Sequence, residues 1–378
     1  MDVCAGFCVV AAAASIFTML LRFKEGRGAG YWTAALGGLG ATLCFIVPSA
    51  DCVGVLLSCS FILIFICVTE RRVEMLLAPS RAVLITGCDS GFGLALAERL
   101  SEMGVRVFAG VLDVNGAGAQ QLRERGSENL QVLQLDVTNG PQIETAHHYI
   151  RTQVSDTGLW GLVNNAGILH CPVDAELHSI AAYRRFMDTN FLAAVKMCQV
   201  FLPLLRRSRG RIVNVSSMAG DVPMPMFAAY GASKAALSIF SKVMRLELSV
   251  WGVEVALIQP AGFRTNIFGN SSDAARYRDE VLTALSSDAR EDYGEAYISS
   301  LPCRLSKMSQ QSAEDLSPVV DDMCHALLSV HPKPVYTPGR MGWLLPFLHH
   351  CCPTAVFDGV ITILMKHSDC EPAGLRRS

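Results

Sequence analysis

The chain has 378 residues, of which 51% are hydrophobic and 17% are charged, and its formal net charge is −2. Soluble domains usually carry about 25% charged residues, so part of this chain is unusually apolar. The apolar fraction excludes disorder as the dominant state. The dispersed Lys and Arg residues exclude the concentrated basic surface that a nucleic-acid binder needs.

The apolar excess lies at the N-terminus. Three apolar runs, residues 3–21, 31–47 and 52–68, each approach the length that a bilayer crossing requires. A cleaved signal peptide is the alternative for the first run, but the basic residues that such a peptide carries in front of its apolar core are missing. We therefore predict a membrane anchor over residues 1–72 with three spans. A hairpin of the second and third runs, with the first run lying differently, stays open.

Basic residues predict the orientation of this anchor. Arg22, Lys24 and Arg27 follow the first run, and Arg71 and Arg72 follow the third. Because basic residues accumulate on the cytoplasmic side of membrane proteins, both clusters place the remainder of the chain in the cytosol.

Apolar strands alternate with helices over residues 81–339, which we read as one domain. Expected strands cover residues 82–86, 105–112, 130–135, 159–163, 210–215 and 253–258, and the clearest helices cover residues 93–103, 181–201 and 233–250. This alternation predicts an α/β fold with a doubly wound parallel sheet that helices cover on both faces. The polar stretch 270–311 is expected to form a helical cover over the site.

Residues 340–378 form an apolar segment followed by a tail. The apolar part, residues 341–365, is read either as a surface-lying amphipathic segment or as a cover for a substrate entrance. Its HHCC sequence at residues 349–352 looks like a metal site. Neighbouring side chains on a helix point about 100° apart, so we expect no metal there.

A glycine-rich turn, Thr86-Gly-Cys-Asp-Ser-Gly-Phe-Gly93, follows the first strand and opens the first helix. Such glycines allow a tight turn and a close approach of a pyrophosphate to the helix N-terminus. Asp113 ends the second strand 20 residues after Gly93. Its carboxylate would accept hydrogen bonds from the adenosine ribose and repel a 2′-phosphate. No Arg follows it directly, so NAD is favoured over NADP.

Tyr230 and Lys234 are four residues apart, which puts both side chains on one face of a helix. A lysine ammonium lowers the pKa of a nearby phenol, so Tyr230 is a candidate general base. The preceding strand ends at Ser217, whose hydroxyl can bind the same substrate oxygen. The alternative is an exposed pair that occurs by chance.

These motifs, together with Asn164-Asn-Ala-Gly167, occur in the order that is typical of the short-chain dehydrogenase/reductase family. The chain resembles that family from about residue 81 to residue 265. The resemblance implies a Rossmann-type fold and a catalytic set of Asn190, Ser217, Tyr230 and Lys234, in which Asn190 holds a water near Lys234. It also implies that Ser217 and Tyr230 bind the substrate.

The same resemblance implies a nicotinamide cofactor, which we expect to be NAD. Its expected binding residues are Thr86, Gly87, Asp89, Ser90, Gly91, Phe92, Gly93, Asp113, Asp136, Val137, Asn164, Ala166, Gly167, Tyr230, Lys234, Pro260 and Thr265. One departure from the family is Pro260-Ala-Gly262, where the family has Pro-Gly. It leaves the local backbone contact open.

Within the family, residues 108–113, 158–164, 202–206, 251–255 and 336–339 resemble the membrane-anchored hydroxysteroid and retinol branch. Residues 211–218, 259–267 and 292–298 are most similar to the 17β-hydroxysteroid dehydrogenases of that branch. The 17β-hydroxysteroid dehydrogenases are favoured, with 11β-hydroxysteroid or retinol dehydrogenases as alternatives. The resemblance implies oxidation of a steroid 17β-hydroxyl, as in estradiol or testosterone, at the endoplasmic reticulum membrane, and it is compatible with a homodimer. A catalytically silent membrane scaffold is less favoured, because Tyr230 and Lys234 are both present.

Apolar side chains follow two of the motifs. Met218 and the stretch Val222-Pro-Met-Pro-Met-Phe227 come after Ser217, and Phe263, Ile267 and Phe268 come after Pro260. Binding pockets for apolar ligands are lined in this way. The alternative is that these residues are ordinary core, because pocket and core use the same residue types.

Overall fold

A computed structural model describes residues 74–125, 128–170, 172–269, 271–339, 341–365 and 370–376. The chain divides into a unit Met1–Met75 and a unit Leu76–Ser378, and nearly all described residues belong to the second. The predicted anchor of residues 1–72 lies outside the described residues. Among the helices that the structure describes, none is long and apolar enough to cross a membrane.

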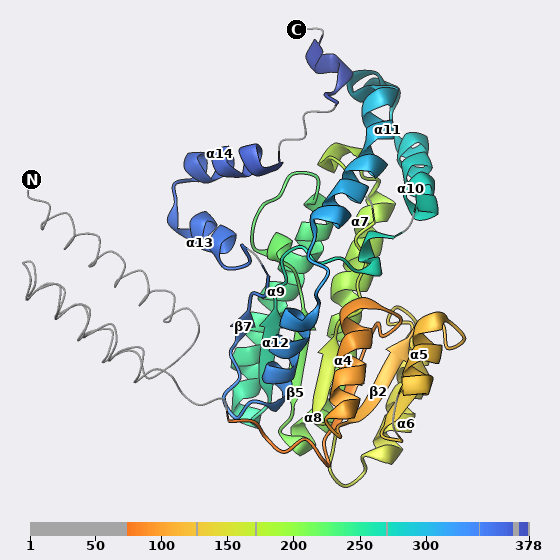
Figure 1. The fold of residues 1–378 in the computed structure, drawn as a ribbon, viewed down its shortest axis with the longest axis vertical. Helices are drawn as coiled ribbons and strands as arrows, with labels where there is room; N and C mark the ends of the chain where they lie inside the picture. The colour runs from red at the N-terminus through yellow and green to blue at the C-terminus, as the bar shows by residue number, and fades with distance from the viewer. Residues whose placement is uncertain are drawn as a thin grey trace, which may run out of the picture. The chain divides into compact units, whose positions relative to one another are not determined.

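In the described part of the chain, seven parallel strands form one sheet in the order β3-β2-β1-β4-β5-β6-β7 (Figure 1). They are β1 (Ala82–Ile85), β2 (Arg106–Val111), β3 (Leu130–Gln134), β4 (Gly161–Asn164), β5 (Arg211–Val215), β6 (Glu254–Ile258) and β7 (Val335–Tyr336). All residues of β1, β4 and β5 are buried, as expected for strands that are covered on both faces. The predicted doubly wound parallel sheet is confirmed.

Two layers of helices enclose the sheet. One face packs against α4 (Gly91–Glu102), α5 (Ala117–Arg125) and α12 (Ser317–Leu328), and the other against α6 (Gly140–Gln153), α8 (Ala193–Ser208) and α9 (Ala228–Leu248). Strand β1 supplies both cores because its successive side chains point to opposite faces. Val83 and Ile85 lie in the first core, whereas Ala82 and Leu84 lie in the second.

The order of the strands reverses direction at β1, which pairs with β2 on one side and with β4 on the other. In open parallel sheets this reversal leaves a crevice at the carboxyl ends of the two central strands. The loops after β1 and β4 are the Gly87 loop and the Asn165 loop. The topology therefore brings the predicted motifs together, although they are about 80 residues apart in the sequence.

Two helices differ from their predicted bounds. The helix expected over residues 181–201 is divided into α7 (Ile180–Met187), a π-helical turn η2 (Asp188–Leu192) and α8. Asn190 lies in this turn, where its side chain hydrogen-bonds to Ile168. The helix expected over residues 233–250 is α9, which begins at Ala228, so Tyr230 and Lys234 lie on the same helix.

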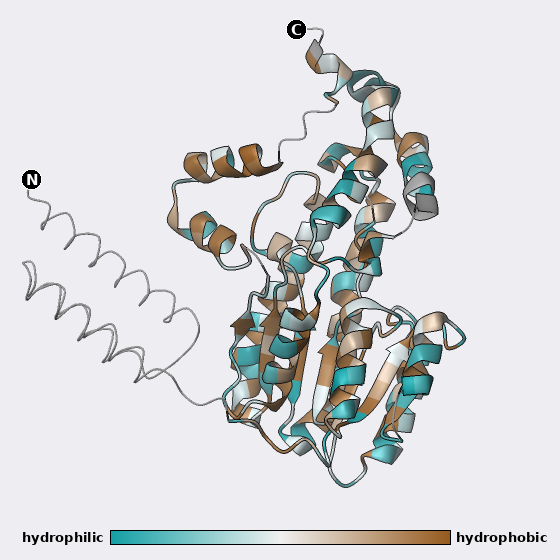
Figure 2. Cartoon of the chain, in the orientation of Figure 1, coloured by the Kyte–Doolittle hydropathy of each residue, from teal (hydrophilic) through white to brown (hydrophobic). Residues whose placement is uncertain are grey.

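The polar stretch after β6 forms α10 (Ser271–Ala284) and α11 (Ser287–Gln311), as predicted, with a kink at Gly294 in α11. The apolar C-terminal segment forms α13 (Leu344–Cys351) and α14 (Thr354–Met365), which Figure 2 colours mainly as hydrophobic. Leu345, Phe357 and Ile361 pack with Met218 and Val222, just after Ser217. This packing favours the interpretation of the segment as a cover.

Candidate active site

A cavity of about 530 Å³ lies at the carboxyl ends of the strands. It is lined by residues that follow β1, β2, β3, β4, β5 and β6. The predicted site residues on its wall are Gly87, Asp89, Ser90, Gly91, Phe92, Asp136, Val137, Ala166, Gly167, Ser217, Tyr230, Lys234, Pro260 and Thr265. The predicted cofactor and catalytic residues thus share one cavity.

Five predicted residues do not line this cavity: Thr86, Gly93, Asp113, Asn164 and Asn190. Thr86, Asn164 and Asn190 are buried behind the wall. Asn164 donates a hydrogen bond to the side chain of Asn214, at 2.8 Å, inside the core. These three side chains therefore support the wall rather than face the cavity.

The glycine loop has a backbone that only glycine fits. Gly87 and Gly91 have φ values of +70° and +60°, which residues with a Cβ rarely adopt. A Cβ on Gly93 would lie 2.3 Å from the carbonyl oxygen of Gly87. Ser90, Gly91 and Phe92 line the cavity at the start of α4, where the first N–H groups of a helix have no partner within the helix. The loop therefore fits the phosphate groups of a dinucleotide.

Hydrogen bonds join the glycine loop to the end of β4. The Thr86 hydroxyl accepts from the backbone N–H groups of Asn165 and Ala166, each at 3.0 Å. The Asn165 side chain donates to the carbonyl oxygens of Thr86 and Gly87, at 2.9 and 3.1 Å. Asn165 also lines the cavity, yet the sequence-based site omitted it. Its place in the Asn-Asn-Ala-Gly segment was the available signal.

Ser217, Tyr230 and Lys234 meet beside the carboxyl end of β5. The Ser217 hydroxyl hydrogen-bonds to the Tyr230 phenol and accepts from the N–H of Ala219 at 3.2 Å. Lys234 is buried, and its Nζ donates to the carbonyl oxygen of Val215 at 2.9 Å. Nζ lies 5.8 Å from the centre of the Tyr230 ring. The expected hydroxyl, phenol and amine are therefore grouped at one wall.

Burial governs the charges at this wall. It raises the pKa of the Tyr230 phenol to about 12, and the hydrogen bond from Ser217 offsets only part of this rise. It also lowers the pKa of Lys234 to about 8. Removal from water disfavours both charged forms, so burial decides the direction of both pKa shifts in the chain alone. The expected lowering of the phenol pKa by Lys234 stays a prediction.

Asn190 and Gly167 shape the space beside Lys234. Both donor hydrogens of the Asn190 amide are engaged, because its Nδ2 donates to the Ile168 carbonyl and the Ser233 hydroxyl, each at 3.0 Å. A Cβ on Gly167 would lie 3.2 Å from both the Lys234 Nζ and the Asn190 Oδ1. The amide thus ties the Ile168 loop to α9. Its expected role in holding a water stays a prediction.

Asp113 is exposed and follows Leu112, which lines the cavity. The Asp89 carboxylate holds the strand end by accepting from the N–H groups of Leu112 and Asp113, at 2.9 and 3.2 Å. No arginine directly follows Asp113 in the sequence, but the fold brings a more distant one to the neighbouring residue. Arg123 of α5 donates to the carbonyl oxygen of Val114 at 2.7 Å. This edge of the site therefore carries one negative charge, from Asp113, and one positive charge, from Arg123.

The remaining wall is mainly apolar. Of the apolar residues expected there from the sequence, six line the cavity, namely Met218, Met224, Phe227, Phe263, Ile267 and Phe268. Val222 and Met226 were also expected but do not line it, and they pack in apolar clusters instead. Two residues that were not expected, Met308 and Ser312, reach it from the end of α11. The local sequence does not predict that these two residues line the cavity. They lie in or just after a polar helix, and the position of that helix depends on its packing against distant segments.

The short chain dehydrogenase family matches residues 81–276. The chain belongs to this family. Estradiol 17-beta-dehydrogenase 2 of Mus musculus is 42% identical over 358 residues, which cover 94% of this chain and 93% of that protein. The 11-beta-hydroxysteroid dehydrogenase type 2 of Ovis aries is 45% identical over 282 residues, which cover 75% of this chain and 66% of that protein.

The solved structures agree on the fold. A short chain dehydrogenase/reductase from Burkholderia phymatum, crystallised in complex with NAD, has a TM-score of 0.60 and 21% sequence identity. The match covers 79% of this chain and 99% of that one. This similarity supports the Rossmann-type architecture alone.

Gly93→Ala should weaken NADH binding at least about tenfold, because the new Cβ would collide with the backbone of the glycine loop. Gly140→Ala is the matched control, since nothing lies within 4 Å of a Cβ at that helix start. NADH fluorescence titration of both purified variants measures the difference, and circular dichroism checks that each is folded. Equal affinities in the two folded variants would contradict the assigned loop.

Proposed function

We propose that this protein oxidises the 17β-hydroxyl of steroids such as estradiol and testosterone to the ketone, with NAD as the hydride acceptor. The proposal rests chiefly on one observation: Ser217, Tyr230 and Lys234 lie on the wall of a cavity that begins at the glycine loop and is otherwise mainly apolar. A relative that aligns with 94% of this chain is named as a dehydrogenase of the estradiol 17β position.

The nicotinamide ring of NAD supplies a hydride acceptor and a positive charge when it is bound. The substrate hydroxyl would accept a hydrogen bond from Ser217 and lie against the phenol of Tyr230. Tyr230 would remove the hydroxyl proton as the carbon loses its hydride, because a positioned base lowers the barrier to that loss. The steroid skeleton would lie against the apolar wall, where Phe227 contacts the Tyr230 ring at 6.2 Å between centroids.

Tyr230 needs nearby positive charge to act as a base, because its pKa in the chain alone is high. With a pKa of about 12 in the chain alone, Tyr230 is protonated at neutral pH. A positive charge placed beside it stabilises the phenolate. In the chain alone, the Ser217 hydrogen bond acts in the same direction. Lys234, held against Val215 at the same wall, would bind the ribose hydroxyls and supply charge when protonated.

Two related activities remain as second candidates, 11β-hydroxysteroid and retinol oxidation. Relatives with both names match the chain, at 45% identity over 282 residues and 39% identity over 279 residues. An apolar wall accepts all three classes of substrate, since hydrophobic burial has no direction. A catalytically silent scaffold fits less well, because the hydroxyl, phenol and amine are all grouped in place.

Tyr230→Phe should reduce steroid oxidation by at least about 10²-fold, the scale of a lost general base, while NADH binding stays within about twofold. The assay supplies membranes containing the full chain with NAD and, separately, estradiol, testosterone, cortisol and retinol. Oxidation of cortisol or retinol in preference to both 17β-hydroxysteroids would replace the proposed substrate. Near-normal turnover by Tyr230→Phe would remove Tyr230 as the base.

The preference for NAD is proposed from Asp113, whose carboxylate ends β2 beside the cavity. A 2′-phosphate at this edge would meet the negative charge of Asp113 before the positive charge of Arg123, which is engaged with Val114. The same carboxylate would accept hydrogen bonds from the ribose diol.

Asp113→Ala should raise kcat/KM with NADP about tenfold relative to NAD, because repulsion is removed and Arg123 can approach the phosphate. The double variant Asp113→Ala with Arg123→Ala should lose most of that gain. Glu124→Ala, an exposed carboxylate on the same helix as Arg123, serves as the control. The assignment fails if the wild-type enzyme already uses both cofactors equally.

Membrane anchoring through residues 1–72, with the catalytic unit in the cytosol at the endoplasmic reticulum, is proposed from the apolar runs and their flanking basic residues. Protease added to intact microsomes should therefore digest the chain beyond residue 81. Detergent-solubilised microsomes give the fully accessible reference. Protection that persists until detergent is added would reverse the orientation, and release of the intact chain by alkaline carbonate would rule out the spans.

A further inference from the structure

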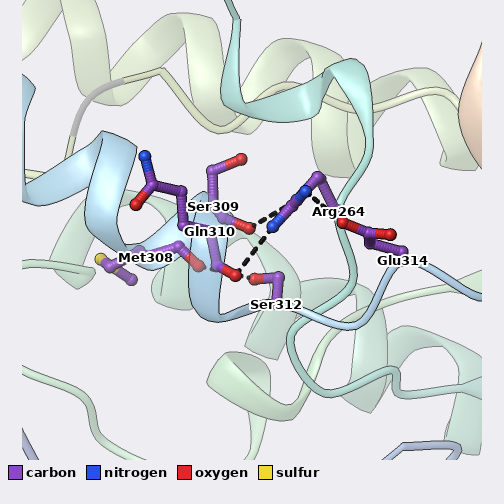
Figure 3. A network of polar contacts seen from close by, with 6 residues as sticks. All are labelled: Arg264, Met308, Ser309, Gln310, Ser312 and Glu314. Carbon is purple, nitrogen blue, oxygen red and sulfur yellow. Dashed lines mark hydrogen bonds and ion pairs between the residues drawn. The ribbon is translucent and has the colours of Figure 1, made fainter.

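Arg264 lies between two cavity-lining residues, Phe263 and Thr265, but its own side chain turns toward the end of α11 (Figure 3). Its Nε donates to the carbonyl oxygen of Ser309 at 3.0 Å, and its Nη2 donates to that of Gln310 at 2.8 Å. One guanidinium thus binds two carbonyls in the last turn of this helix.

The backbone makes a second connection at the same place. Phe263 and Ala313 form an isolated parallel bridge. The Arg264 N–H donates to the Ala313 carbonyl at 2.7 Å, and the Ala313 N–H donates to the Gly262 carbonyl at 3.1 Å. The segment after β6 is therefore joined to the chain just beyond α11 through its main chain and through the Arg264 side chain.

Arg264 contacts the helix end through two carbonyl oxygens and contacts Glu314 through an ion pair. Arg264 also pairs with Glu314 at 2.5 Å, but the Glu314 side chain is 75% exposed, and exposed ion pairs contribute little. The last carbonyls of a helix lack partners within the helix and attract positive charge. Because the guanidinium is planar and forked, it can serve two such carbonyls together.

The turn that Arg264 holds carries part of the apolar wall. Met308 and Ser312 line the cavity from this end of α11, and the Ser312 hydroxyl donates to the Met308 carbonyl at 2.8 Å (Figure 3). Phe263, the residue before Arg264, packs edge-to-face against Phe92 of the glycine loop, with ring centroids 5.7 Å apart. The segment of residues 262–264 thus connects the glycine loop to the part of the cavity wall that α11 supplies.

We propose that Arg264 is a positioning residue that sets the substrate wall formed by Met308 and Ser312. The inference rests on the proposed function, because it concerns the lipophilic substrate of that same cavity. Arg264 does not line the cavity and so contributes through α11. Its loss should weaken substrate binding and leave the proton transfer at Tyr230 largely intact.

The first test separates KM from kcat. Arg264→Ala should raise the steroid KM about tenfold, the scale of a lost charge-assisted hydrogen bond, with kcat and NADH affinity each within about twofold of wild type. Arg264→Lys should recover only part of the loss, because an ammonium group cannot span both carbonyls as a guanidinium does. Glu314→Gln should stay near wild type.

Arg278→Ala is the matched control, since Arg278 lies on the neighbouring helix α10 and its recorded side-chain bonds go to the adjacent Asp279. It should leave the steroid KM unchanged. An unchanged KM in Arg264→Ala would overturn the proposal. So would a fall in kcat as large as the rise in KM, or an effect of Glu314→Gln equal to that of Arg264→Ala.

Hydrogen exchange provides a readout that does not depend on the substrate. In Arg264→Ala, amides of residues 308–314 should exchange faster than in wild type, whereas those of β5 should not change. If the wild-type enzyme oxidises no steroid, the proposed function fails, and this exchange still decides whether Arg264 holds the last turn of α11. Unchanged exchange there would overturn the positioning role, whatever the substrate is.

Discussion

The rest of the site depends on the connection between the ends of β1 and β4. Thr86 and Asn165 hold these two strand ends together through four hydrogen bonds between the glycine loop and the Asn165 loop. The strand order reverses at this point, so the crevice beside it has walls from both halves of the sheet. Without this joint, the glycine loop would lose its support from β4. Cofactor geometry and catalytic geometry therefore share one structural origin.

Removal from water sets the protonation equilibria of the side chains in this crevice. Ionised groups are costly in a buried site, and here burial moves the pKa values of Tyr230 and Lys234 toward their neutral forms. A site of this kind responds strongly to a charge that arrives with a ligand, because interactions between charges are less screened away from water. In the chain alone the Tyr230 phenol is therefore protonated at neutral pH, and the proposed cofactor would supply a positive charge that stabilises its phenolate.

Under the proposed function, substrate choice would depend on a different set of elements from those that perform the chemistry. The wall facing the proposed steroid comes from the segments after β5 and β6 and from the end of α11. Helices α13 and α14 pack on the segment after Ser217. Since hydrophobic contacts lack direction, the specificity of such a wall depends on where its elements are held. Arg264 and the bridge between Phe263 and Ala313 are the contacts that hold one of them.

The amino-acid sequence alone was sufficient for the parallel α/β sheet, the glycine loop and the grouping of Ser217, Tyr230 and Lys234, because strand periodicity and short motifs are local properties. The break in the helix at Asn190, the contact of Arg123 with Val114 next to Asp113 and the docking of Met308 and Ser312 came only with the tertiary structure. The direction of the Tyr230 pKa shift did as well. Each depends on contacts between segments that are distant in sequence or on removal from water, and neither is encoded in the spacing of neighbouring residues.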